Sequence, residues 1–286
     1  MKGIITKTLG GYFFVADKEQ NIIMANIRGK IKKKIYPGDY VEYNNKIVEE
    51  TYKRNNLLPR PHVANVDKVL ITHSLHEPDL NLLLLDRFII AIEASGLNPV
   101  IIINKMDKKL KGDNILINKI YDYTRAGYNV FFISAKDGQG INELKNYLKD
   151  DIMVLTGPSG VGKTSLINRL CDDLNLPTNK VSSKLKKGIH TTRHVELLPL
   201  YNNNWLADTP GFTSLNIKNI LVDDLKYFFP EFNVFQNKCK FNTCSHTHEP
   251  DCAIKKAVNQ DLISKRRYNS YLNFYKELKN RKCNYD

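Results

Sequence analysis

Residues 157–164, GPSGVGKT, fit the G-x-x-x-x-G-K-[ST] pattern of a phosphate-binding loop. The apolar run DIMVLTG leads into this segment and TSLINRL continues from it with helical spacing, so the pattern lies between an expected strand and an expected helix. Its glycines let backbone N–H groups curl around phosphate oxygens, and the helix N-terminus adds a positive dipole end. Because such a loop follows a strand of an α/β sheet, it constrains the fold more than any other feature of the chain.

Nine consecutive residues of this segment are candidates for nucleotide binding. Lys163 can reach the β- and γ-phosphates, which also makes it a candidate catalytic residue, and the Thr164 hydroxyl can ligate Mg²⁺. The nine positions are Gly157, Pro158, Ser159, Gly160, Val161, Gly162, Lys163, Thr164 and Ser165.

Two motifs that are typical of guanine recognition lie upstream of the phosphate-binding loop. Asn104-Lys105-Met106-Asp107 ends an apolar run, and Asp107 can accept two hydrogen bonds from guanine N1–H and N2–H₂, a donor pair that adenine lacks. Ser134-Ala135-Lys136 ends the next apolar run, where a backbone N–H can donate to guanine O6. The candidate base-binding residues are Asn104, Lys105, Asp107, Ser134, Ala135 and Lys136.

A further motif lies downstream, where Asp208-Thr209-Pro210-Gly211 ends the run NNWLA. Asp208 can hold Mg²⁺ through water, and the Gly211 N–H can contact the γ-phosphate. Residues 188–193, GIHTTR, lie between the phosphate-binding loop and this motif and offer threonine hydroxyls for a second Mg²⁺ contact in a switch loop.

The order of these motifs is the reverse of the usual one, because the base motifs precede the phosphate-binding loop. If the helix INELKNYLKD joins directly to the strand DIMVLTG, the chain is a circularly permuted GTPase and the same sheet can form, since chain termini often lie close together. Alternating strands and helices from residue 62 onward indicate a doubly wound, mainly parallel sheet. The site depends on spatial position and therefore survives the permutation.

The two ends of the chain differ from this centre. Short apolar runs broken by turn residues over residues 1–56 predict an OB-fold β-barrel, a fold that often binds nucleic acid, and RNNLLPRP at 54–61 forms a boundary. The predicted architecture is multidomain: an OB-fold RNA-binding domain at 1–58, a circularly permuted P-loop α/β GTPase domain at 62–226, and a C-terminal α-helical zinc-binding domain at 227–286.

Four side chains near the C-terminus predict one structural Zn²⁺ site. Cys239, Cys244, His246 and Cys252 supply three thiolates and an imidazole from one short stretch of chain, which is a closed tetrahedral set. His248 is the alternative to His246, and disulfides are the alternative to the metal. Cys171 and Cys283 fall outside the set.

Charge indicates a polyanionic partner. Residues 1–60 carry 12 Lys and Arg against 6 Asp and Glu, and residues 231–286 carry 11 against 6, whereas residues 61–150 carry 11 of each. Basic flanks on a neutral centre suggest two surfaces that face nucleic acid, although solvated lysine-rich faces would have the same composition. No signal peptide and no apolar run near the ~18 residues of a membrane span are apparent, so we expect a cytoplasmic protein without a membrane partner.

Taken together, the permuted order, PRPHVANVDKVLI, GPSGVGKTSLINRL, IHTTRHVEL, LADTPGF and CKFNTCSHTHEPDCAI resemble the ribosome small subunit-dependent GTPase A (RsgA or YjeQ) family over essentially the whole chain. The resemblance implies a monomeric GTPase that binds GTP and GDP, is stimulated by the small ribosomal subunit, contacts its rRNA and acts in late maturation of that subunit.

The resemblance also implies how GTP is hydrolysed. Phe212 stands where many GTPases place the glutamine that orients water, so unaided hydrolysis should be slow and His190 is the implied catalytic substitute. The family usually has His-Thr-Thr-Thr in this loop, whereas Arg193 is the third residue after His190 here. Either remaining threonine could bind Mg²⁺, and we favour Thr192.

Two questions stay open at the level of sequence: the function of the chain and the role of its C-terminal segment. The chain could instead be an RNA-binding protein that holds guanine nucleotide passively, or a nucleoside monophosphate kinase, since guanylate kinases carry a similar GPSGVGK loop. The C-terminal segment KRRYNSYLNFYKELKNRK places Tyr268, Tyr271 and Tyr275 on one helix face, which can pack on the zinc domain. The alternative is that Lys265, Arg266 and Arg267 contact rRNA.

Overall fold

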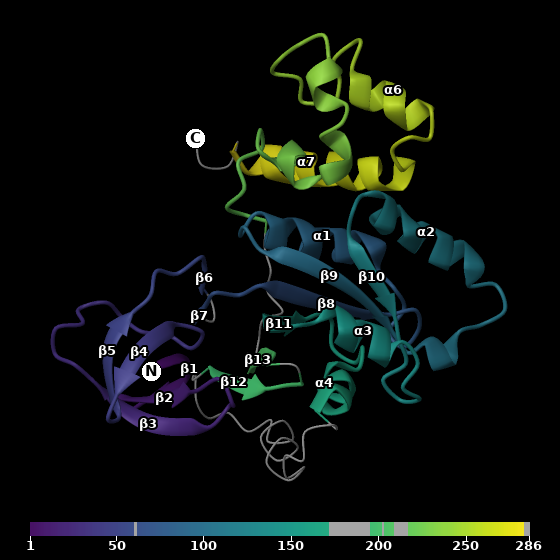
Figure 1. Ribbon diagram of the computed structural model, residues 1–286. Helices are drawn as coiled ribbons and strands as arrows, with labels where there is room; N and C mark the ends of the chain where they lie inside the picture. Colours follow the sequence, from purple (N-terminus) through teal and green to yellow (C-terminus); the bar gives the residue numbers. More distant parts are fainter. Residues whose placement is uncertain (60–61, 172–194, 202, 209–216, 283–286) are drawn as a thin grey trace. The chain divides into compact units, whose positions relative to one another are not determined.

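The computed structural model describes residues 1–59, 62–171, 195–201, 203–208 and 217–282 (Figure 1). The chain forms two compact units. One comprises residues 1–79, 96–108 and 131–214, and the other comprises residues 80–95, 109–130 and 215–286. The boundaries expected at residues 58–62 and 226–227 follow the composition of the sequence rather than contacts and stay a prediction.

The N-terminal residues of the first unit form a closed five-stranded barrel. Hydrogen bonds join the strands in the order β1-β2-β3-β5-β4, and β4 pairs back onto β1. The pairs of this barrel are antiparallel except β3 with β5. The strands are β1 (Lys2–Leu9), β2 (Tyr12–Ala16), β3 (Ile22–Ile27), β4 (Tyr40–Asn44) and β5 (Ile47–Thr51).

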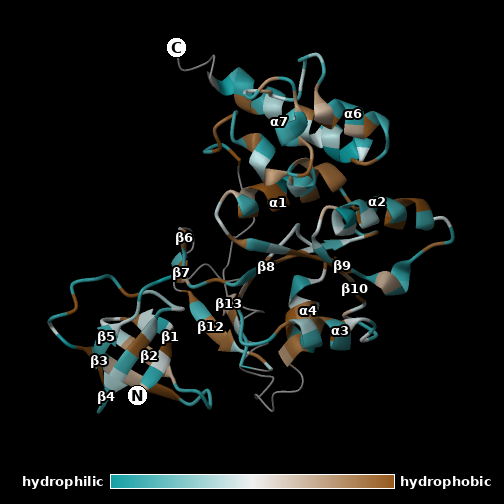
Figure 2. Ribbon diagram, turned by 45° about the horizontal axis from the view of Figure 1, so that its top comes forward, coloured by the Kyte–Doolittle hydropathy of each residue, from teal (hydrophilic) through white to brown (hydrophobic). Residues whose placement is uncertain are grey.

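Buried and exposed side chains alternate along these strands, as expected for strands that enclose a barrel core. In β4 the buried Val41 and Tyr43 alternate with more exposed neighbours, and Figure 2 shows hydrophobic and hydrophilic residues mixed along the barrel strands. Val15 and Val48 complete the same core. This is the closed five-stranded barrel expected of an OB-fold. A short hairpin of β6 (Leu57–Pro59) and β7 (His62–Ala64) follows it.

The rest of the first unit is built on a twisted, mainly parallel sheet. Its strands lie in the order β10-β9-β8-β11-β13-β12, with β8 parallel to β9 and β11, and β11 parallel to β13. The strand β12 runs antiparallel beside β13. The strands are β8 (Lys68–Ser74), β9 (Asn98–Asn104), β10 (Asn129–Phe132), β11 (Ile152–Thr156), β12 (Glu196–Pro199) and β13 (Trp205–Asp208).

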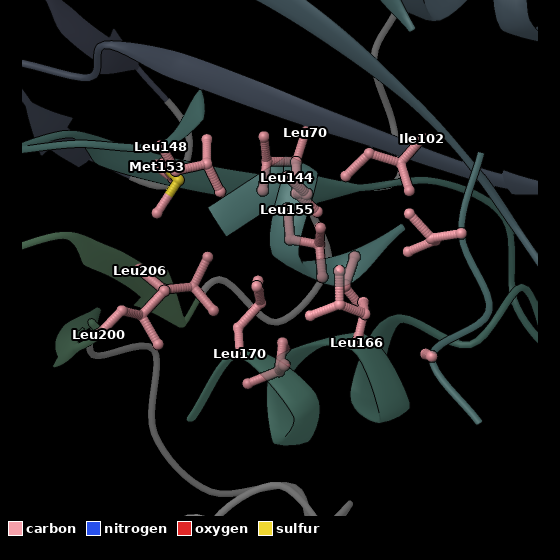
Figure 3. Packing of buried hydrophobic residues seen from close by; sticks show 14 of the residues in the cluster. Leu70, Ile102, Leu144, Leu148, Met153, Leu155, Leu166, Leu170, Leu200 and Leu206 are labelled. Carbon is pink, nitrogen blue, oxygen red and sulfur yellow. The ribbon is translucent and has the colours of Figure 1, made fainter. Parts of the chain in front are cut away.

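This strand order confirms the predicted permuted α/β fold. The strand that leads into the phosphate-binding loop, β11, lies between β8 and β13, although β9 and β10 separate it from β8 in the sequence. Helices α3 (Ile141–Tyr147) and α4 (Lys163–Cys171) cover one face of the sheet. Figure 3 shows Leu166 and Leu170 of α4 packed beneath Leu155 in the core of this unit.

The second unit is helical. Its helix α1 begins after Asn81, whose side chain accepts a hydrogen bond from the Leu84 N–H at 2.9 Å. Aromatic residues from the short helical turns, including Phe229 and Phe232, pack on Tyr271 of the last helix. Its elements are α1 (Leu82–Glu93), α2 (Asn114–Arg125), η2 (Leu225–Phe228), η3 (Pro230–Phe232), η4 (Gln236–Lys238), α6 (Ala253–Asn259) and α7 (Lys265–Lys282). None of the helices described is both long and apolar enough to cross a membrane.

Candidate nucleotide and zinc sites

The phosphate-binding loop turns between β11 and α4 on three glycines with positive φ: Gly157, Gly160 and Gly162. A Cβ on Gly157 would lie 2.0 Å from the carbonyl oxygen of Thr72, so this position must be glycine for the loop to pass β8. Lys163 begins α4, and the exposed Thr164 follows it. A tight glycine turn that leads directly into a helix N-terminus is the arrangement that phosphate binding requires.

Lys163 folds back along this loop. Its Nζ donates to the carbonyl oxygens of Gly157 at 2.8 Å and Pro158 at 2.6 Å. Burial lowers the pKa of Lys163. Burial, and then the positive charge of Lys163, lower the pKa of the nearby His73 on β8 to about 4. His73 is thus a neutral imidazole at pH 7, and Lys163 supplies the positive charge here.

Asn104 joins the base motifs to the phosphate-binding loop. Its side chain is 1% exposed, its Nδ2 donates to the Val161 carbonyl oxygen at 3.0 Å, and its Oδ1 accepts from the Ala135 N–H at 3.0 Å. The Ser134 hydroxyl donates to Asp107 Oδ1 at 2.8 Å, which holds the carboxylate expected to bind guanine. The structure therefore brings all three predicted loops together at the carboxyl edge of the sheet.

The loop after β8 was not anticipated from the sequence. The ammonium of Lys105 donates to the carbonyl oxygen of Glu77, and the ammonium of Lys108 pairs with the Glu77 carboxylate. A Cβ on Gly160 would lie 3.6 Å from Pro78 Cδ, so the same loop also borders the phosphate-binding loop. The only sequence signal was its position after a strand, which many structural loops share.

The predicted Mg²⁺-binding and switch residues are only partly described. Asp208 ends β13, next to β11, so its backbone lies on the same edge of the sheet as the phosphate-binding loop. His190, Thr192, Gly211 and Phe212 lie outside the described residues, so their roles stay predictions.

The second unit holds the predicted metal ligands. The ligand atoms of Cys239, Cys244, His246 and Cys252 all lie within 4.8 Å of one another. The His246 Nδ1 is 3.5 Å from the sulfurs of Cys239 and Cys252, and those sulfurs are 3.9 Å apart.

These distances match zinc rather than a disulfide. A tetrahedral Zn²⁺ with bonds of ~2.3 Å to sulfur and ~2.05 Å to nitrogen implies about 3.8 Å between sulfurs and about 3.6 Å between sulfur and nitrogen. A disulfide would bring two sulfurs to about 2.05 Å. His248 is exposed and instead contacts Thr247 Oγ1 at 2.9 Å, so His246 is the fourth ligand of the set.

One face of the C-terminal helix α7 packs on the zinc loop. Tyr268 and Tyr271 are buried and their hydroxyls donate to the carbonyl oxygens of His246 and Ser245, so this face packs on the zinc loop. Arg267 is 1% exposed and pairs with Asp86 and Glu231, so the predicted contact of Arg267 with rRNA is wrong. Lys265 is exposed and the Arg266 side chain is 21% exposed beside Asp86, so an rRNA contact of these two residues stays a prediction.

Comparison with known sequences finds a family for residues 2–218 and relatives that match almost the full length of the chain. Residues 51–218 match the family described as RsgA GTPase, and residues 2–52 match the RsgA N-terminal domain. The chain is 42% identical to the Small ribosomal subunit biogenesis GTPase RsgA of Caldanaerobacter subterraneus subsp. tengcongensis, over 98% of this chain and 96% of that protein. It is also 42% identical to the protein of the same name from Clostridium perfringens, over 99% of this chain and all of that protein.

Two solved structures also resemble this chain over almost its full length. The crystal structure of YjeQ from Thermotoga maritima is 35% identical, with a TM-score of 0.83 and coverage of 97% of this chain and 98% of that one. YloQ, described as a circularly permuted GTPase, is 33% identical, with a TM-score of 0.82 and coverage of 98% and 95%.

Proposed function

Because this chain belongs to the RsgA GTPase family, we propose that it hydrolyses GTP to GDP and phosphate in the biogenesis of the small ribosomal subunit. The observation that carries this function is the pair of hydrogen bonds by which Asn104 joins the phosphate-binding loop to Ala135. A protein that bound only phosphate would not need this connection between phosphate and base loops. A monophosphate kinase would likewise have no use for Asp107.

Each end of the nucleotide has its own set of residues. The backbone from Gly157 to Thr164, together with Lys163, would bind the phosphates, and the Thr164 hydroxyl would hold the Mg²⁺ that accompanies GTP. Asp107 and Ser134-Ala135-Lys136 bind guanine. The Ser134–Asp107 hydrogen bond supports this assignment because it orients the carboxylate before the base arrives.

Hydrolysis requires a water molecule to attack the γ-phosphorus while the bond to the β-phosphate oxygen breaks and GDP leaves. His190 is the residue proposed to orient that water, and Thr192, Asp208 and Gly211 are proposed to complete the Mg²⁺ and γ-phosphate contacts. The resemblance to the family supports these four roles. Since Phe212 cannot orient water, hydrolysis by the protein alone is expected to be slow.

The zinc site gives the C-terminal part its structure. Cys239, Cys244, His246 and Cys252 would hold one Zn²⁺ with four protein ligands, and a set of four protein ligands is typical of a structural rather than a catalytic metal.

We further propose that rRNA of the small subunit binds two basic surfaces. The first is the loop before β4, where Lys30, Lys32, Lys33 and Lys34 are all exposed. The second lies beside the zinc site, where Lys238 and Lys240 approach the rings of Phe235 and Phe241 at 5.6 and 5.9 Å. Lysines that flank partly exposed rings suit phosphates and unstacked bases. The protein is expected to act as a cytoplasmic monomer.

The test is phosphate release from GTP and from ATP, by the protein alone and with purified small ribosomal subunits. We expect slow, GTP-selective release that the subunits stimulate, with a stimulation that weakens as salt rises. GTP binding without any stimulated release would favour a passive nucleotide-binding protein. Phosphate transfer to GMP would identify a kinase. Light scattering during gel filtration would measure the molecular mass and so test whether the protein is a monomer.

A further inference from the structure

One buried carboxylate connects three helices of the second unit. Asp86, in α1, is fully buried; its Oδ1 accepts from Tyr123 Oη at 2.7 Å and from Arg267 Nη1 at 2.8 Å. Its Oδ2 accepts from Arg266 Nη1 at 2.8 Å and from Ser270 Oγ at 2.6 Å. Tyr123 belongs to α2 and the other three donors belong to α7, so the packing of all three helices depends on the same carboxylate.

The charges in this network are balanced by pairing. Burial alone would raise the pKa of Asp86, but Arg267 and Arg266 hold it below its ordinary value, so the carboxylate stays ionised. Arg267 has a second partner in Glu231, with contacts of 2.7 and 3.1 Å. Removing one partner of a buried ion pair destabilises a fold by about 3–5 kcal/mol, so the stability of this network depends on each of its charged members.

The same helix α7 also supports the zinc loop. Tyr268, next to Arg267, donates its hydroxyl to the carbonyl oxygen of the metal ligand His246 at 2.7 Å. Tyr271, next to Ser270, donates to the carbonyl oxygen of Ser245. Neighbouring residues of α7 thus bind the backbone of the zinc loop and the Asp86 carboxylate of α1. A change in the zinc loop that moves α7 would therefore also change the contacts of Asp86.

The helices that share Asp86 continue directly from loops on the base side of the nucleotide site. Helix α1 begins at Leu82, soon after Glu77, which holds Lys105 and Lys108. Helix α2 begins at Asn114, soon after Asp107. Each of these two helices is therefore joined through a few residues of chain to a segment near the guanine motif.

We propose that Zn²⁺ binding at Cys239, Cys244, His246 and Cys252 is thermodynamically linked, through α7 and Asp86, to the packing of α1 and α2 and so to the affinity for guanine nucleotide. Linkage makes the effect reciprocal: nucleotide tightens Zn²⁺ binding by the factor by which Zn²⁺ tightens nucleotide binding. Only the last step, that the ligand is a guanine nucleotide, rests on the proposed function.

The experiment compares the zinc-loaded full-length protein with the same protein after chelation, by hydrogen exchange and by titration with a fluorescent GDP analogue. We expect chelation to speed exchange in α1 and α2 while α3 and α4 stay protected, and to weaken GDP binding by at least about fivefold, the lower end of ordinary coupling. Unchanged exchange in α1 and α2 while the zinc loop opens would overturn the proposal. Unchanged GDP affinity would overturn it as well.

Two substitutions test whether the coupling between the zinc site and helices α1 and α2 passes through Tyr268 and Asp86. Tyr268→Phe removes one hydroxyl from the His246 carbonyl and should reduce the effect of chelation on α1 and α2 without changing zinc content. Asp86→Asn should reduce it further, where the protein folds. Tyr227→Phe is the matched control, because Tyr227 is 55% exposed and lies outside the network. A Tyr268→Phe response equal to wild type would also overturn the proposal. Failure of the zinc-loaded protein to bind GDP at all would instead count against the proposed function, since the exchange measurement does not depend on it.

Discussion

Replacing Asn104 by alanine tests whether one side chain joins the two halves of the nucleotide site. The change deletes the donor to the Val161 carbonyl oxygen and the acceptor for the Ala135 N–H, both at 3.0 Å and both buried. A buried polar group left without a partner costs about 1–3 kcal/mol, so two such groups cost about 2–6 kcal/mol together. Both groups lie in loops that bind nucleotide, so part of this loss must appear as weaker binding. We expect at least about 1.4 kcal/mol of it there, about tenfold in Kd.

The assay is a titration with a fluorescent GDP analogue, paired with urea unfolding of the same sample. The matched control is Asn118→Ala, which removes an exposed asparagine from α2 and should leave both quantities near wild type. An Asn104→Ala protein that is folded, as stable as wild type and within twofold of its GDP affinity would refute the argument.

Three further changes in the first unit have expected outcomes. Since burial, and then Lys163, lower the pKa of His73 to about 4, the unfolded chain binds a proton between pH 6.5 and 4 that the folded chain does not, so stability decreases as the pH is lowered through this window. The free energy of unfolding, measured with urea, should fall by about 2 kcal/mol between pH 7.5 and 5. If the His73→Gln protein lost as much stability over the same range, His73 would not be the cause. Asp107→Ala should weaken GTP binding at least about 100-fold without improving ATP binding, because two charge-assisted hydrogen bonds are lost; competition binding would show whether selectivity persists. Gly157→Ala should abolish nucleotide binding but leave zinc content unchanged, because its Cβ would lie 2.0 Å from the Thr72 carbonyl oxygen; tight GTP binding would show that the loop can move.

Most of the nucleotide and zinc sites could be predicted because their signals are local. A phosphate-binding loop, a base motif and a strand end each occupy a few consecutive residues, and parallel strands place their carboxyl ends on one edge of a sheet. The zinc set runs only from Cys239 to Cys252, so its geometry follows from spacing.

What could not be predicted depends on partners far apart in the chain. Asn104 and Val161 are 57 residues apart, and Arg267 and Asp86 are 181 apart. Two adjacent arginines at the start of a helix have the same appearance whether they face RNA or a buried carboxylate. The position of Asp86 distinguishes these two environments, because a charged side chain is normally buried only where an oppositely charged group is close to it.

The position of β11 between β8 and β13 has a consequence for how the chain is made. The guanine-recognition half, β8 to β10, leaves the ribosome before the phosphate-binding half, so β8, which ends at Ser74, cannot pair with β11 until the chain beyond Ile152 has been made. At ordinary synthesis rates that interval lasts about 4–16 s, during which one edge of β8 is unpaired and exposed to other chains. Limited proteolysis of chains stalled before residue 150 would detect that open edge, and full protection there would contradict it. An unpermuted protein of this kind would make the β11 strand first. In this chain β11, which leads into the phosphate-binding loop, is made after the base-recognition strands. A newly made molecule therefore cannot bind GTP until β8, β9 and β10 have already been synthesised.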